Sequence, residues 1–152
     1  MQKKIKSDAT TFESDQDTQT IKRTKPSALP PLSEVQMEIM NAVWDGGEAT
    51  LGEIWKMLSA RRTVARNTIQ TLLTRLVEKG WLGYRVTGKT FHYRATRPRE
   101  TTLRDMAERF VAGTFRGSTE GLVLTLLESQ LLSQDEAARI RAMIEQAEHN
   151  AE

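Results

Sequence analysis

The hydrophobic pattern of this 152-residue chain changes at Gly80 from the spacing of a helix to the alternation of strands. Just before Gly80, apolar side chains recur at i, i+3, i+4, i+7 and i+8, which is typical of a helix with one buried face. These residues are Ile69, Leu72, Leu73, Leu76 and Val77. After Gly80, residues 81–86 and 90–95 are rich in aromatic and β-branched side chains, and residues 87–89 predict a short turn between them. The sequence therefore predicts a helix that ends at the glycine and a β-hairpin that follows it.

Two capping-box patterns predict two further helices upstream. Residues 33–36 (SEVQ) open the first, which the glycines at 46–47 end, and residues 50–53 (TLGE) open a shorter second helix. In a capping box, the side chains of the first and fourth residues each bond the other's backbone N–H group. A basic turn at 60–63 leads into the third helix. Three short helices and a hairpin are the order of a winged helix-turn-helix, so we predict a mainly α fold with a small β-hairpin wing.

After Pro98 the pattern returns to helices with an unusually apolar surface. The run 122–127 (LVLTLL) is too apolar for a helix that lies freely in water, and a third capping box at 133–136 opens the last helix. We predict that these helices form a dimer, with the interface residues Phe110, Leu122, Val123, Leu126, Leu127, Leu131, Ile140 and Ile144. The alternative is that the same side chains form a core within one copy of this segment.

The N-terminal residues 1–31 mix Lys, Asp, Thr and Gln with few large apolar groups and end in a proline-rich stretch. Such a segment cannot bury enough apolar surface to offset its ordering entropy, so we expect a disordered tail and an extended linker. The predicted organisation is this tail at 1–31, a winged helix-turn-helix DNA-binding domain at 32–98 and a helical dimerisation domain at 99–150.

Basic residues are concentrated in the part of the chain with the predicted third helix and hairpin. Residues 61–97 contain nine Lys and Arg side chains and a single acidic residue, Glu78, whereas the net charge of the whole chain is +2. A basic block of this kind suits a polyanionic partner such as DNA. On charge alone, a solvated basic face is an equal alternative.

The composition argues against several other classes of protein. With no cysteine and two histidines, the chain offers no disulfide and no thiolate metal site, and we expect no metal and no cofactor. It contains no glycine-rich phosphate loop and no nucleophile–base pair, so we do not expect an enzyme. No apolar run reaches the roughly 20 residues of a membrane span, and the N-terminus lacks the apolar core of a signal peptide. We therefore expect a cytoplasmic protein without membrane insertion.

The predicted third helix has the side chains expected of a helix that reads bases. Asn and Gln can pair with adenine, Arg with guanine, and Thr can contact a thymine methyl group. The candidate base-reading residues, opposite the apolar stripe, are Arg66, Asn67, Thr68, Gln70, Thr71 and Thr74. The candidate phosphate-binding residues, in the preceding turn and on the hairpin, are Arg61, Arg62, Arg85, Lys89 and Arg94. The tryptophans are expected to pack in the core and not to stack on bases: Trp44, Trp55 and Trp81.

The combination of these elements resembles a known family, the bacterial penicillinase and methicillin-resistance repressors of the BlaI/MecI type, which are winged-helix transcriptional regulators. The resemblance covers about residues 32–147 and rests on four segments. They are MNAVWD (40–45), NTIQTLLTRLVEKG (67–80), FHYRA (91–95) and GLVLTLL (121–127).

The resemblance implies a homodimeric repressor that binds an inverted-repeat, double-stranded DNA operator and is dimerised by its C-terminal helices. It also implies that Asn67, Thr68, Gln70 and Thr71 lie at base-reading positions of the recognition helix. In the family, a membrane sensor detects a β-lactam antibiotic and the repressor is cut between its domains. The resemblance implies that the corresponding cleavage in this chain lies near Arg109 and Phe110, and that a membrane sensor triggers it in response to a β-lactam or to a different signal.

Two other functions fit the same pattern of elements. The first is a winged-helix regulator that is released from DNA by a small ligand instead of by proteolysis. The second is a winged-helix interaction module that binds protein and not DNA, against which the basic stretch 61–97 argues.

Overall fold

The computed structural model describes residues 29–152, which divide into two compact units with a boundary between Thr96 and Arg97. Most of the predicted tail, residues 1–28, lies outside the described residues. Each unit is described below by itself.

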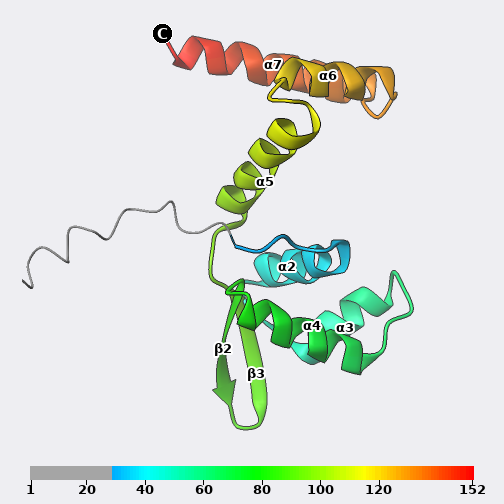
Figure 1. The fold of residues 1–152 in the computed structure, drawn as a ribbon, viewed down its shortest axis with the longest axis vertical. Coiled ribbons are helices and arrows are strands. Elements are labelled where there is room, and N and C mark those ends of the chain that lie inside the picture. The colour runs from blue at the N-terminus through cyan, green and yellow to red at the C-terminus, as the bar shows by residue number, and fades with distance from the viewer. Residues whose placement is uncertain (1–28) are drawn as a thin grey trace, which may run out of the picture. The chain divides into compact units, whose positions relative to one another are not determined.

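The first unit is a winged helix-turn-helix, and it confirms the predicted fold class (Figure 1). Three helices are followed by a hairpin, and a very short strand adds to the hairpin to give an antiparallel sheet of order β1-β3-β2. The elements are α2 (Glu34–Gly46), β1 (Ala49–Thr50), α3 (Leu51–Ser59), α4 (Arg66–Glu78), β2 (Leu82–Thr87) and β3 (Thr90–Ala95).

The first two helices begin at the predicted capping boxes. At α2, Gln36 N donates to Ser33 Oγ (3.2 Å), and Ser33 N donates to Gln36 Oε1 (3.0 Å). At α3, Glu53 N donates to Thr50 Oγ1 (3.3 Å), and Thr50 N donates to Glu53 Oε2 (2.8 Å). Each box satisfies two backbone N–H groups that the first turn of a helix leaves without an intrahelical partner.

The hairpin has a tighter turn than the three residues predicted from the sequence. Thr87 and Thr90 pair directly, so the turn consists of Gly88 and Lys89. Gly88 has φ +63°, as a two-residue hairpin turn requires at its first position. The strand β1, which pairs with β3 through Ala49 and Tyr93, was not predicted, because two residues are too few to show an alternation.

The core of this unit lies between the three helices and the base of the sheet. Its largest fully buried side chains are Ile39, Met40, Val43, Ile54, Ile69, Leu73 and Leu76. The packed region begins earlier than the predicted start at residue 32, because Leu29 packs against the core and Trp81 Nε1 donates to Pro30 O (2.8 Å). Trp81 is buried and Trp44 is half-buried, whereas Trp55 is 37% exposed, which corrects its assignment to the core.

Replacing Trp81 with Phe should lower the free energy of unfolding by about 1–3 kcal/mol, since it removes a partly buried hydrogen bond and part of a buried ring. Urea unfolding followed by circular dichroism measures the change. The control is Trp55→Phe, which removes the indole N–H that donates to Val64 O (3.0 Å) at an exposed position. A loss for Trp55→Phe as large as that for Trp81→Phe would contradict the importance of the N-terminal contact.

The second unit consists of three helices, and its third helix begins at the predicted capping box of Ser133 and Glu136. The helices are α5 (Arg99–Thr114), α6 (Thr119–Glu128) and α7 (Gln134–Asn150). The turn between α5 and α6 includes Arg116 and Gly117 at positive φ. Within residues 29–152, no helix combines the length and the apolar character needed to cross a membrane.

Candidate nucleic-acid interface

The exposed face of α4 displays every residue predicted to read bases. The face opposite it is anchored by Ile69, Leu73 and Leu76, which are fully buried. Thr71 Oγ1 donates to Asn67 O (3.0 Å) and Thr74 Oγ1 donates to Gln70 O (3.0 Å), so both hydroxyl protons are used within the helix. These two threonines therefore offer methyl groups and oxygen lone pairs to a partner. The exposed residues are Arg66, Asn67, Thr68, Gln70, Thr71 and Thr74.

A concave surface joins the start of α4 to the wing. It encloses about 390 Å³ and brings Arg66 and Gln70 of α4 together with Lys89 at the tip of the hairpin. A β-carbon at Gly52 would lie 3.8 Å from Arg66 Nη2, so the guanidinium reaches the first turn of α3. Sequence reasoning did not predict the other lining residues, which are Thr50, Leu51, Gly52, Thr90, Phe91 and Tyr93.

Arg62, predicted to bind phosphate, is instead engaged within the protein. Its guanidinium forms an ion pair with Glu38 of α2 and lies 3.6 Å from Glu34 Oε1. The pair connects the turn after α3 to the first helix, so the structure gives Arg62 a scaffolding contact. A phosphate contact by this residue stays a prediction.

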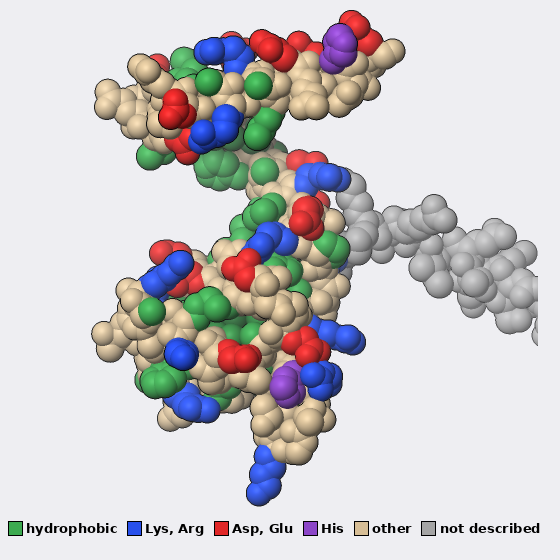
Figure 2. All heavy atoms as spheres, turned by 180° about the vertical axis from the view of Figure 1, so that it is seen from behind, with side chains coloured by type: hydrophobic (Ala, Val, Ile, Leu, Met, Phe, Trp, Pro, Cys, Tyr) green, Lys and Arg blue, Asp and Glu red, His purple; other side chains and the backbone are tan. Residues whose placement is uncertain are grey.

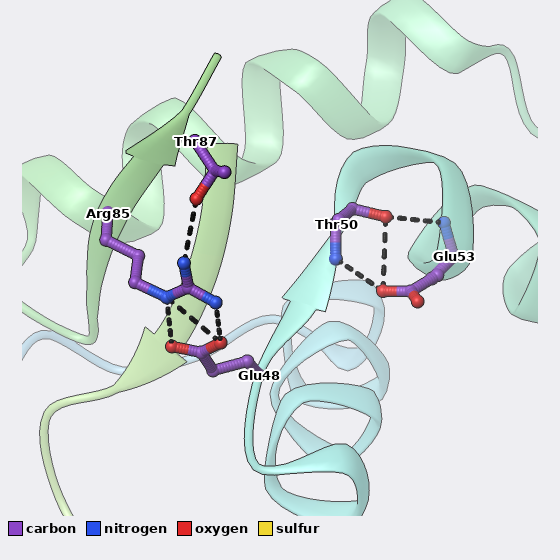
Figure 3. Close-up of polar contacts among 5 residues, drawn as sticks. All are labelled: Glu48, Thr50, Glu53, Arg85 and Thr87. Atoms are coloured by element: carbon purple, nitrogen blue, oxygen red, sulfur yellow. Dashed lines mark hydrogen bonds and ion pairs between the residues drawn. The ribbon is translucent and has the colours of Figure 1, made fainter. Parts of the chain in front are cut away.

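Arg85 is also held by an acidic residue (Figure 3). Its Nε lies 2.9 Å from Glu48 Oε1, its Nη2 lies 2.8 Å from Glu48 Oε2, and its Nη1 donates to Thr87 Oγ1 (2.8 Å). The hydrogen bonds from Arg85 hold the pKa of the Glu48 carboxyl below its usual value, and Glu48 in turn raises the pKa of Arg85. Both groups are therefore charged at neutral pH.

The remaining predicted phosphate-binding residues, Arg61, Lys89 and Arg94, are exposed in the turn and on the wing. Figure 2 shows basic side chains at the tip of the hairpin and around its base. Within residues 29–152, no group of three or more His, Asp or Glu side chains is arranged to hold a metal ion. Because these exposed cations lie in the turn before α4 and on the wing, the surface formed by α4 and the wing is suited to a polyanion.

The second unit exposes the apolar residues predicted for the dimer interface. Leu122 and Leu126 are half-buried, and the other six are exposed, from 40% for Ile140 to 71% for Leu131. Leu103, Met106, Leu124 and Met143, which were not predicted, are also exposed. The alternative of a core within this segment does not agree with the structure, because no apolar side chain of residues 97–152 is buried.

The bond between Arg109 and Phe110 lies inside α5, in its second half, and both residues are exposed. The Phe110 ring contacts the Phe115 ring edge to face, with 5.5 Å between the ring centroids. The bond therefore lies in helical backbone at an accessible position.

Comparison with known proteins gives consistent matches across the described part of the chain. A family model described as penicillinase repressor matches residues 32–146. The penicillinase repressor of Bacillus licheniformis is 28% identical over 118 residues, which cover 78% of this chain and 92% of that protein. The methicillin resistance regulatory protein MecI of Staphylococcus aureus (strain N315) is 27% identical over 113 residues, which cover 74% and 92%.

Among solved structures, the monomeric form of Bacillus licheniformis BlaI in complex with the blaP half-operator is 32% identical. The match has a TM-score of 0.43 and covers 47% of this chain and 88% of that chain. The DNA-binding domain of the repressor BlaI gives a TM-score of 0.44 at 32% identity, with 47% and 87% covered.

Proposed function

This chain belongs to the penicillinase repressor family, and we propose on that premise that it is a transcriptional repressor that binds an inverted-repeat DNA operator as a homodimer. The observation that carries the proposal is the exposed face of α4, whose polar side chains adjoin Lys89 of the wing across one concave surface. A helix with short polar side chains on its outer face fits the major groove.

The roles of the side chains on α4 follow from their chemistry. Asn67 and Gln70 would pair with adenine, Arg66 with guanine, and the methyl groups of Thr71 and Thr74 would contact thymine. The exposed cations of the turn and the wing, Arg61, Lys89 and Arg94, would bind phosphates and so fix the position of α4 without reading bases.

The exposed apolar residues of α5, α6 and α7 support the homodimer. A soluble chain rarely exposes a large contiguous apolar surface unless a partner covers it. Two protomers on half-sites roughly 34 Å apart would match the twofold symmetry of an inverted repeat. The second unit would then act as a dimerisation domain, and a single protomer would have access to one half-site.

Release from DNA would follow from cleavage between Arg109 and Phe110, as the family resemblance implies, in response to a membrane sensor of a β-lactam or another signal. Cleavage there would separate α6 and α7 from the DNA-binding unit. Because both residues lie in helical backbone, α5 must first open locally to present an extended segment to a protease.

Binding to the promoter DNA upstream of this chain's own gene tests the proposal. In a gel shift across a salt series, binding should weaken as salt rises, with a log–log slope of about −5 if each protomer neutralises about three phosphates through Arg61, Lys89 and Arg94. Gln70→Ala should lower the affinity by about 1–3 kcal/mol per lost bidentate base contact, and Thr71→Ala, which removes one methyl contact, by about 0.8 kcal/mol per contact.

The matched control is Gln146→Ala, at an exposed position of α7. Equal losses for Gln146→Ala and Gln70→Ala would contradict base reading by α4. No affinity for any DNA, with the fold intact, would favour a module that binds protein.

A further inference from the structure

We propose that Glu48 and Arg85 brace the wing, so that Glu48 sets how well Lys89 at the wing tip contacts DNA. In this arrangement Arg85 is a positioning residue and does not bind a phosphate. The inference rests on the proposed DNA binding and adds to it an acidic residue that favours binding.

The ion pair ties together the two edges of the small sheet. Glu48 directly precedes β1, and Arg85 lies in β2, with β3 between these two strands. Thr50 of β1 and Arg85 of β2 both pair with His92 of β3, so the contact from Glu48 to Arg85 passes over the central strand. The base of the wing is thereby fixed to the connection that follows α2, in addition to its backbone hydrogen bonds.

The same guanidinium extends the brace toward the tip of the hairpin. Two of its nitrogens bond the Glu48 carboxylate, and the third donates to Thr87 Oγ1 (Figure 3). Thr87 pairs with Thr90 and closes the turn that presents Lys89. All three guanidinium nitrogens of Arg85 are thus engaged within the protein, whereas Lys89 lines the concave surface beside Arg66 and Gln70.

Because the Glu48–Arg85 pair is exposed to solvent, its main effect is on the position of the wing and not on the stability of the unit. The Arg85 and Glu48 side chains are 56% and 34% exposed, and exposed ion pairs contribute little to global stability. Losing the pair should therefore leave the unit folded while freeing the wing. This property makes the brace testable through DNA binding.

The direction in which Glu48→Gln changes the affinity for DNA distinguishes a brace from a purely electrostatic effect. DNA is a polyanion, so removing an acidic side chain near it should tighten binding if charge alone matters. Removing a brace should weaken binding instead, because the contact made by Lys89 becomes less favourable. Glu48→Gln therefore gives opposite results under the two explanations.

The test measures the affinity of the full chain for its own promoter DNA, with Glu48→Gln and Arg85→Gln alone and together, in the wild type and in Lys89→Ala. We expect each single change to weaken binding about three- to tenfold, as for the loss of an exposed pair in each protomer, and the combination to be no weaker. In Lys89→Ala, neither change should have a further effect. A change that merely unfolded the unit would weaken binding in both backgrounds.

Glu78→Gln is the matched control, since it removes an exposed acid of α4 without touching the wing, and it should not weaken binding. Thermal melts confirm that each variant is folded. Tighter binding by Glu48→Gln would overturn the brace, and so would a loss for Arg85→Gln that persists in Lys89→Ala. If the wild-type chain binds no DNA, the proposed function itself fails; if it binds and the Glu48 variant is unchanged, only the brace fails.

Discussion

A chain that ends at Arg97 should bind an inverted-repeat operator about a hundredfold to ten-thousandfold more weakly than the full chain. The truncation removes α5, α6 and α7, and with them the exposed apolar residues proposed to join two protomers. Without that link, the second protomer no longer reaches its half-site at a high effective concentration. The affinity for the whole operator then falls about a hundredfold to ten-thousandfold, although each protomer keeps the residues that contact DNA. Fluorescence anisotropy with the full operator duplex measures the difference.

A half-site duplex provides the control for this truncation. Both chains should bind it with similar affinity, because α4 and the wing are present in each. The truncated chain should also melt cooperatively, since every buried apolar side chain of the described residues lies before Arg97.

In the full chain, Leu127→Asp should reproduce much of the loss of operator affinity by placing a charge on the exposed face of α6. Equal affinity of the full and truncated chains for the whole operator would contradict the dimer.

The helices were predictable because their signals are local. A capping box can be recognised from four residues, and the buried face of α4 from nine. The pattern at 33–36 and the apolar stripe from Ile69 to Val77 therefore predict their helices without reference to the rest of the chain. Strand β1 has no such signal, since its two residues are ordered by pairing with β3 from a distant part of the chain. Trp55 shows the same limit, because its apolar character predicts burial while its indole bonds the loop at Val64.

The candidate interface likewise has one part that the sequence predicts and another part that it does not. Helical periodicity identifies the exposed face of α4, because which residues face outward depends on spacing alone. The partners of Arg62 and Arg85 depend on tertiary structure, as Glu38 and Glu48 lie 24 and 37 residues away in the sequence. A basic residue count cannot distinguish a cation that is available to DNA from one already paired within the protein.

Replacing Leu73 with Ala should lower the free energy of unfolding by about 2–5 kcal/mol, the range for a leucine removed from a packed core. Leu73 is fully buried on the inner face of α4, so the change weakens the support of the proposed recognition helix directly. Chemical denaturation at several protein concentrations measures the loss, which should be the same at each concentration because the cavity lies within one protomer.

The matched control is Leu127→Ala, which removes the same atoms from a side chain that is 54% exposed in the single chain. If α6 is covered by a second protomer, this change should lower stability by an amount that depends on protein concentration, because unfolding is then linked to dissociation. If α6 is exposed in solution, the change should cost almost nothing at any concentration. The comparison of the two leucines therefore separates the core of the winged unit from the proposed dimer interface, and a concentration-independent cost at Leu127 equal to that at Leu73 would contradict the assignment of Leu127 to that interface.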